Sequence, residues 1–168
     1  LASMVQSEAR LEADFFKVSR TFLNRIDVGM KLQSDATVNY GANRKTFQST
    51  AEDRADSNLY NTYFHVGLPI GPISAPGRVA IYAALNPAKG DWLYFCTIDL
   101  ETGETVFSAT YAEHELAVKQ FESRILNTRS LEVEILQNII EGENGFRLEV
   151  AAPGLTKEDF KINLESNV

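Results

Sequence analysis

Apolar residues recur every three or four positions near the start of the chain. Within residues 2–26, this spacing joins Phe15, Val18, Phe22 and Ile26, and the lysine and arginine residues between them fall on the other faces. The pattern predicts an amphipathic helix over residues 2–26.

Glu8 lies beside the apolar face of this segment rather than opposite it. Ala2, Val5 and Ala9 share that face. A carboxyl group next to an apolar stripe can lose part of its hydration, which raises its pKa and lets it hold a proton near neutral pH. Most glutamates in such places are simply solvated. The residues alone therefore leave two interpretations of Glu8, an acid–base group or a surface charge.

A short polar and β-branched run occupies residues 30–41. Ser34 and Asp35 can cap a helix or close a turn. Gln33 adds an amide group of the kind that binds sugar hydroxyl and acetamido groups. Capping and binding both stay open for this run. Residues 42–58 are polar, carry charges of both signs and predict an exposed excursion.

The stretch 60–77 holds three of the five prolines and three of the ten glycines, and it also carries apolar anchors such as Leu68 and Ile73. Proline fixes φ and glycine reaches backbone angles closed to other residues, so this composition predicts an ordered loop rather than a flexible linker. Such a loop is either an Ω-loop packed by its own side chains or one wall of a binding site.

The segment after this loop predicts helices and strands that do not alternate as βαβ units. Residues 79–84 are compatible with a short helix, residues 92–98 and 105–110 are strand candidates joined by a turn, and 112–125 again has helical spacing. The predicted fold class is therefore α+β, with a helical core, a β-hairpin and a closing helix.

Composition limits the partners of the chain. A hydrophobic content of 44% and a charged content of 23% over 168 residues are typical of a globular protein, and no apolar run is long enough to cross a bilayer. The net charge of −7 argues against nucleic acid or an anionic membrane as the main partner. Because the chain opens inside the first helical pattern, we expect a truncated product.

Several short motifs follow one another along residues 1–125. They are Leu-Ala-Ser-Met-Val-Gln-Ser-Glu at 1–8, Gly-Met-Lys-Leu-Gln-Ser-Asp-Ala-Thr-Val-Asn-Tyr at 29–40, Tyr-Asn-Thr-Tyr at 60–63, Gly-Leu-Pro at 67–69, Gly-Pro-Ile at 71–73 and Ala-Glu-His at 112–114. In order and spacing they resemble the catalytic part of the YceG-like endolytic murein transglycosylases. The resemblance covers about three quarters of the chain.

This resemblance implies a cell-envelope lyase that cuts the β-1,4 bond between N-acetylmuramic acid and N-acetylglucosamine inside nascent glycan strands and leaves a 1,6-anhydro end. The family's catalytic glutamate matches Glu8, whereas the other acidic position of its helix motif is Gln6 here. A single carboxyl group suffices for this chemistry, because the C6 hydroxyl of the sugar replaces the water or the enzyme nucleophile of ordinary glycosidases.

The resemblance also implies the surroundings of Glu8. No cofactor, metal or nucleic acid is expected, and the family acts at the extracytoplasmic face of the inner membrane with cell-wall synthesis machinery, although its membrane anchor is absent from this chain. A glycan groove would be lined by Gln33, Ser34, Asp35, Asn61, Tyr63, Gly67, Leu68, Pro69, Gly71 and Ile73.

The tail has a different character. Residues 135–168 are similar to the opening strands of the alpha-crystallin domain of small heat-shock proteins, and alternation predicts strands at 146–151 and 160–164. Two partial domains in one chain indicate a fusion with a junction at 126–134. Uncovered strands favour self-association. A non-catalytic glycan-binding fragment and a chaperone-like oligomerising module therefore remain alternatives to a lyase.

Overall fold

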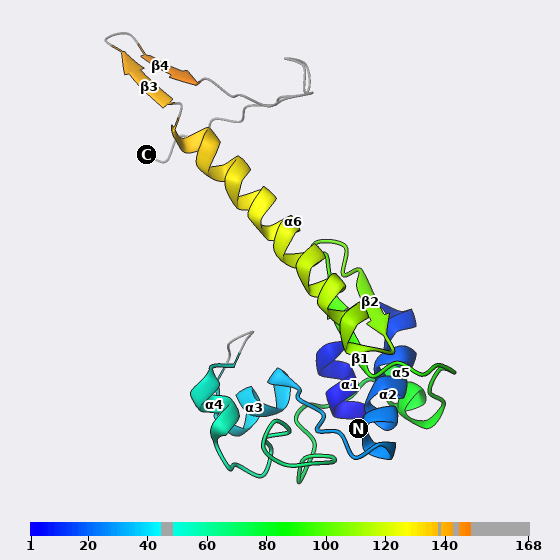
Figure 1. Ribbon diagram of the computed structural model, residues 1–168. Helices are drawn as coiled ribbons and strands as arrows, with labels where there is room; N and C mark the ends of the chain where they lie inside the picture. Colours follow the sequence, from blue (N-terminus) through cyan, green and yellow to red (C-terminus); the bar gives the residue numbers. More distant parts are fainter. Residues whose placement is uncertain (45–48, 138, 143–144, 149–168) are drawn as a thin grey trace. The chain divides into compact units, whose positions relative to one another are not determined.

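The computed structural model describes residues 1–44, 49–137, 139–142 and 145–148. The chain divides into two units, Leu1–Glu122 and Ser123–Val168. The described part consists of helices and two antiparallel strand pairs, so the predicted α+β class is confirmed, with helices dominating (Figure 1). None of the helices described is both long and apolar enough to span a membrane.

Two helices occupy the segment predicted as one. Helix α1 covers Ala2–Glu8 and helix α2 covers Glu12–Asp27, and between them Ala9 and Leu11 have extended backbone angles. The prediction of a continuous helix is therefore wrong. The break lacks the usual sequence signals, because no proline or glycine marks it and no side chain caps the start of α2. Its consequence is that Glu8 becomes the last residue of α1.

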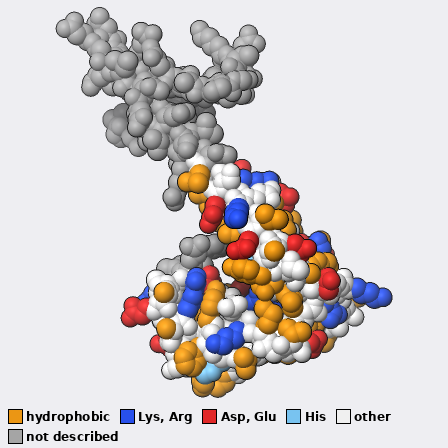
Figure 2. All heavy atoms as spheres, in the orientation of Figure 1, with side chains coloured by type: hydrophobic (Ala, Val, Ile, Leu, Met, Phe, Trp, Pro, Cys, Tyr) orange, Lys and Arg blue, Asp and Glu red, His pale blue; other side chains and the backbone are white. Residues whose placement is uncertain are grey.

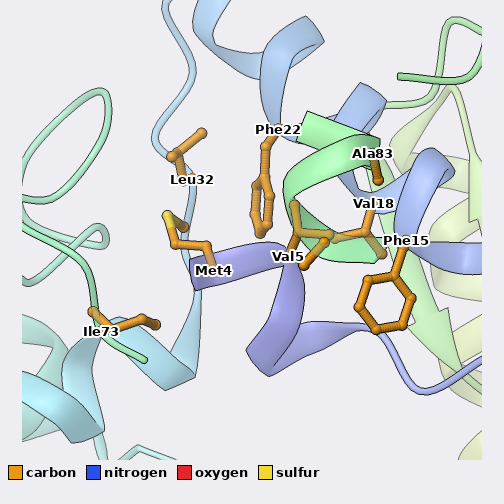
Figure 3. Packing of buried hydrophobic residues seen from close by; sticks show 9 residues of the cluster. Met4, Val5, Phe15, Val18, Phe22, Leu32, Ile73 and Ala83 are labelled. Carbon is orange, nitrogen blue, oxygen red and sulfur yellow. The ribbon is translucent and has the colours of Figure 1, made fainter. Parts of the chain in front are cut away.

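The hydrophobic core of the first unit lies where α1, α2 and helix α5 (Arg78–Leu85) pack together. Met4 of α1, Phe22 of α2 and Leu32 of the following loop lie side by side in it, each at most 1% exposed (Figure 3). Ala80 and Ala83 of α5 are fully buried, and such small side chains allow a close approach of the helices. This core fixes the end of α1 and thereby the position of Glu8.

Two shorter helices follow the loop. Helix α3 covers Asp35–Gly41, and helix α4 covers Ala51–Ala55. The predicted exposed excursion at 42–58 therefore contains a helix. Thr50 and Asp53 form a reciprocal capping box at its start. The Thr-x-x-Asp spacing of this box was a readable signal in the sequence.

The predicted loop at 60–77 is anchored at its C-terminal end. Ile73 is buried in the core, and its backbone N–H donates to Ser3 Oγ at 3.1 Å. Earlier in the loop, large apolar side chains are exposed, among them Val66 and Ile70. Hydrophobic and charged side chains are interspersed on the face shown in Figure 2.

The predicted β-hairpin is confirmed. Strand β1 (Tyr94–Thr97) pairs antiparallel with strand β2 (Thr105–Ser108), and Tyr94 lies opposite Ser108. Helix α6 begins soon afterwards at Tyr111 and ends at Gln137, so the closing helix continues through the predicted junction at 126–134.

The second unit contains one described strand pair. Strand β3 (Ile139–Gly142) pairs antiparallel with strand β4 (Gly145–Leu148). The predicted strand at 146–151 is thus described as far as Leu148. Its last residues and the predicted strand at 160–164 lie outside the described residues.

Candidate active site

A cavity of about 500 Å³ lies at the C-terminal end of α1. Five of the side chains predicted from the sequence line it. They are Glu8, Gln33, Ser34, Asp35 and Tyr63. The structure therefore brings the expected acid together with the polar run at the start of α3.

Ser34 binds the carboxyl group of Glu8. Its hydroxyl donates to Glu8 Oε1, and the backbone N–H of Ala36 donates to the same carboxyl group. Ser34 occupies the N-cap position of α3, yet its side chain makes no capping hydrogen bond. The hydroxyl, for which the sequence left capping and binding open, is thus directed to Glu8.

The electrostatic environment favours a proton on Glu8. Burial raises the pKa of the Glu8 carboxyl group above its ordinary value, and the negative charge of Asp35 raises the pKa further. The hydrogen bonds from Ser34 and Ala36 lower this pKa but do not cancel the rise. Glu8 therefore keeps its proton to a higher pH than a solvated glutamate, which is a property of a general acid.

Asp35 is held by a polar network of its own. Ser49 Oγ donates to Asp35 Oδ1, and Arg54 Nη2 lies 3.6 Å from the same oxygen. Burial, followed by the charge of Asp35, raises the pKa of Tyr63 to about 12. The phenol therefore remains a hydrogen-bond donor, and the Arg54 guanidinium lies over its ring at 4.9 Å from the centroid. These contacts fix Asp35 beside Glu8 as an oriented negative charge.

Arg25 joins the loop before α3 to the hairpin. Its Nε donates to the carbonyl of Leu93 and its Nη1 to the carbonyl of Leu32, at 2.5 and 2.8 Å. Gln33, the next residue in the loop, has a positive φ of 52°, which is uncommon outside glycine. Its N–H donates to the carbonyl of Thr62. Arg25 and Thr62 thus hold the turn that aims Ser34 at Glu8.

Other side chains of the cavity were not predicted. Tyr94 of β1 and Tyr111 and His114 of α6 line it together with Arg25. A partial signal existed, because Ala112-Glu-His114 was one of the matched motifs, but nothing local in the sequence places a hairpin strand next to a helix start.

Several predicted groove residues lie elsewhere. Asn61 is buried, and its amide donates to the carbonyls of Asp53, Arg54 and Asp56. Ile73 belongs to the core cluster. The remaining loop residues do not line the cavity, namely Gly67, Leu68, Pro69 and Gly71.

Gln6 has a structural contact. Its Oε1 accepts a hydrogen bond of 2.9 Å from the backbone N–H of Gly77, which precedes α5. The residue at the family's other acidic position thus ties α1 to α5. In the part of the chain that is described, no three histidine, cysteine or acidic residues are grouped so as to hold a metal ion.

Residues 1–120 match the profile of the YceG-like family over more than half of the chain. The chain belongs to the YceG-like family. The matched residues include Glu8 of α1 as well as Tyr111 and His114 of α6. The YceG-like resemblance inferred from the motifs is confirmed.

Known YceG-like relatives are considerably longer than this chain. The endolytic murein transglycosylase of Bacillus subtilis is 38% identical over 123 residues, which are 73% of this chain and 34% of the relative. That of Streptococcus pneumoniae is 35% identical over 133 residues, covering 76% and 24%. A crystal structure of a putative YceG-like protein from Listeria monocytogenes matches with a TM-score of 0.63 at 39% identity, over 68% of this chain and 37% of that one. The chain therefore spans between about a quarter and just over a third of the length of these relatives.

Proposed function

We propose that the chain is the catalytic part of an endolytic peptidoglycan lytic transglycosylase and that Glu8 is its acid and base. The proposal rests on one observation, a carboxyl group of raised pKa that accepts a hydrogen bond from Ser34 and lines a cavity of about 500 Å³. Membership of the YceG-like family and the names of the relatives, which specify murein, support glycan strands as the substrate.

The reaction needs one proton carrier. Glu8 donates its proton to the glycosidic oxygen as the bond from that oxygen to the anomeric carbon of N-acetylmuramic acid breaks. The C6 hydroxyl of the same sugar then attacks the anomeric carbon, and Glu8 removes the hydroxyl proton. The products are a free N-acetylglucosamine hydroxyl and a 1,6-anhydro end. No water is consumed, and Glu8 ends protonated as it began, with the proton from the C6 hydroxyl in place of the one given to the leaving oxygen.

Asp35 raises the question of a two-carboxylate hydrolase, in which a second carboxylate activates water or attacks the sugar. In this site, one oxygen of Asp35, Oδ1, accepts from Ser49 and lies 3.6 Å from Arg54 Nη2, so these contacts hold the carboxylate in place. We assign it the role of keeping the proton on Glu8. The products separate the two reactions, because hydrolysis adds one water to the glycan end and the lyase reaction does not.

The wider setting follows from the family. We propose that the substrate is nascent glycan strands at the extracytoplasmic face of the inner membrane, close to cell-wall synthesis machinery. We also propose that residues 1–125 carry the chemistry, and that residues 135–168 are an alpha-crystallin-like segment joined through 126–134.

The test is Glu8→Gln in the 168-residue chain, with Glu12→Gln as a matched control, because Glu12 is exposed and does not line the cavity. Both proteins are incubated with uncrosslinked glycan strands, and the products are analysed by mass spectrometry. We expect anhydro-ended products from the unmodified chain and the control, and none from Glu8→Gln. Full activity in Glu8→Gln refutes the assignment. Binding without any product from the unmodified chain favours the glycan-binding alternative.

A further inference from the structure

Three aromatic side chains gather on one side of the cavity, and the mechanism above does not use them. The rings of Tyr94 and His114 are stacked, with centroids 5.2 Å apart and an interplanar angle of 20°. Tyr111 meets Tyr94 edge to face at 5.9 Å and lies 6.3 Å from His114. We call Tyr94, Tyr111 and His114 the aromatic wall.

Local structure at the start of α6 places two of these rings. Glu113 Oε2 accepts from the backbone N–H groups of Ala109 and Thr110, and Thr110 Oγ1 accepts from the N–H of Glu113. This reciprocal cap fixes the first turn of α6. Tyr111 and His114 are three residues apart and so share one face of the helix. The cap thereby sets the wall directly after the hairpin that carries Tyr94.

Tyr94 is occupied by protein contacts. Besides the stacked His114 ring, the Arg25 guanidinium lies over the Tyr94 ring at 5.2 Å from the centroid. Tyr111 is different, because 60% of its surface is exposed although it lines a cavity. A large apolar ring is costly to leave in water, and aromatic side chains in such sites commonly bind ligands.

The surroundings of His114 favour one tautomer of its ring. Its Nδ1 is buried and has no hydrogen-bond partner among the described residues. An unpaired N–H is costly to bury, so the proton of the neutral ring belongs on Nε2, and the ring meets the cavity through this edge. Burial, followed by the nearby charge of Arg25, lowers the pKa of His114, which favours the neutral ring.

We propose that the aromatic wall is a sugar-binding subsite for the ring next to the cleaved bond, in which Tyr111 stacks on the C–H face of a pyranose and His114 Nε2–H donates to an oxygen of the same sugar. A pyranose presents both an apolar ring face and hydroxyl or acetamido oxygens. The wall offers an exposed ring face and a single oriented donor, so the two surfaces are chemically complementary. This inference rests on the proposed function, because it deepens the same site.

The test measures binding of uncrosslinked strands of N-acetylglucosamine and N-acetylmuramic acid to the 168-residue chain carrying Glu8→Gln, so that no product forms. We expect Tyr111→Ala to weaken binding about tenfold, or about 1.4 kcal/mol, while Tyr111→Phe keeps the ring and the affinity. Gln places an amide near the position of Nε2, whereas Asn places one near Nδ1. His114→Gln should therefore bind better than His114→Asn.

The chain supplies matched controls outside the cavity. Tyr82 of α5 is 59% exposed, so Tyr82→Ala removes a ring of the same exposure. His65, whose Nε2 contacts the carbonyl of Ser57, is the other histidine, and His65→Asn controls for the loss of an imidazole. Both controls should bind as the parent does. Thermal unfolding confirms that each variant is folded.

Failure of the subsite and failure of the function give different results. If the unmodified chain cleaves glycan and Tyr111→Ala and His114→Asn bind as tightly as the controls, the subsite is refuted and the function stands. If the unmodified chain neither binds nor cleaves glycan, the proposed function falls and the subsite falls with it. In the active chain, the subsite also requires Tyr111→Ala to raise KM more than it lowers kcat.

Discussion

Replacing Ser34 with alanine tests what its hydrogen bond contributes to the proposed catalysis by Glu8. The change removes the hydroxyl that donates to Glu8 Oε1 and leaves the hydrogen bond from the backbone N–H of Ala36 in place. Because Ser34 is 4% exposed, water does not readily replace the lost hydroxyl. We expect the fold to survive, since alanine fits the space of serine.

The expected loss of rate follows from the change of charge during catalysis. When Glu8 gives up its proton it becomes an anion, and hydrogen bonds to charged groups contribute about 1.5–3 kcal/mol. If this contribution appears in the transition state, kcat falls about 10- to 150-fold, because each 1.36 kcal/mol is a factor of ten. Mass-resolved initial rates on uncrosslinked glycan strands measure this loss.

The pH dependence gives a second test with a definite sign. The proposed mechanism needs protonated Glu8 in its first step, so we expect the rate to decline as pH rises through the pKa of Glu8. The Ser34 hydrogen bond lowers that pKa, and its removal moves the decline to higher pH. Asp35 raises that pKa, so Asp35→Asn moves the decline to lower pH.

Opposite shifts from two neighbouring side chains are hard to produce by general damage. Ser57→Ala is the control for Ser34→Ala, because Ser57 is exposed and lies outside the cavity. The reasoning is refuted if Ser34→Ala keeps the full kcat, or if both site variants move the decline in the same direction.

Other changes probe the stability of the fold and the role of the tail. Asn61→Ala removes the donor to one buried and two part-buried carbonyl groups, and urea unfolding should show that the free energy of unfolding falls by about 1–3 kcal/mol. Unchanged stability with weaker glycan binding would instead favour a role for Asn61 in the substrate groove. Phe22→Ala should lower the free energy of unfolding by about 3–5 kcal/mol, because it leaves a cavity in the core. The same unfolding experiment measures this loss, with Leu85→Ala at an exposed position as the control. Deleting residues 135–168 should keep any lyase activity, and light scattering should show a shift toward the monomer. A joint loss of activity and folding would contradict the hypothesis that residues 1–125 carry the chemistry without the tail.

Much of the first unit was predictable because its signals are local. The hairpin, the ordered proline-rich loop and α5 follow from apolar alternation, turn residues and helical spacing. The break between α1 and α2 was not predictable from spacing, because Ala9 and Leu11 carry no turn signal although both have extended backbone angles.

The candidate site was predictable on one side only. Glu8 and Ser34 come from motifs that match a family, and the structure brings them into contact. Asn61 was expected to bind substrate because it is polar and lies in a motif, but the backbone of the preceding segment uses its amide. Tyr111 and His114 reach the cavity through tertiary structure, which short-range patterns do not encode.

The cavity is lined by Glu8 of the first helix, α1, and by Tyr111 and His114 at the start of α6. Synthesis proceeds from the N-terminus, so the carboxyl group is made long before the side chains that complete its surroundings. A chain whose synthesis stops before residue 111 has Glu8 but lacks part of the cavity. Premature termination, or proteolysis that removes α6, should therefore release fragments with the acid and without a complete site.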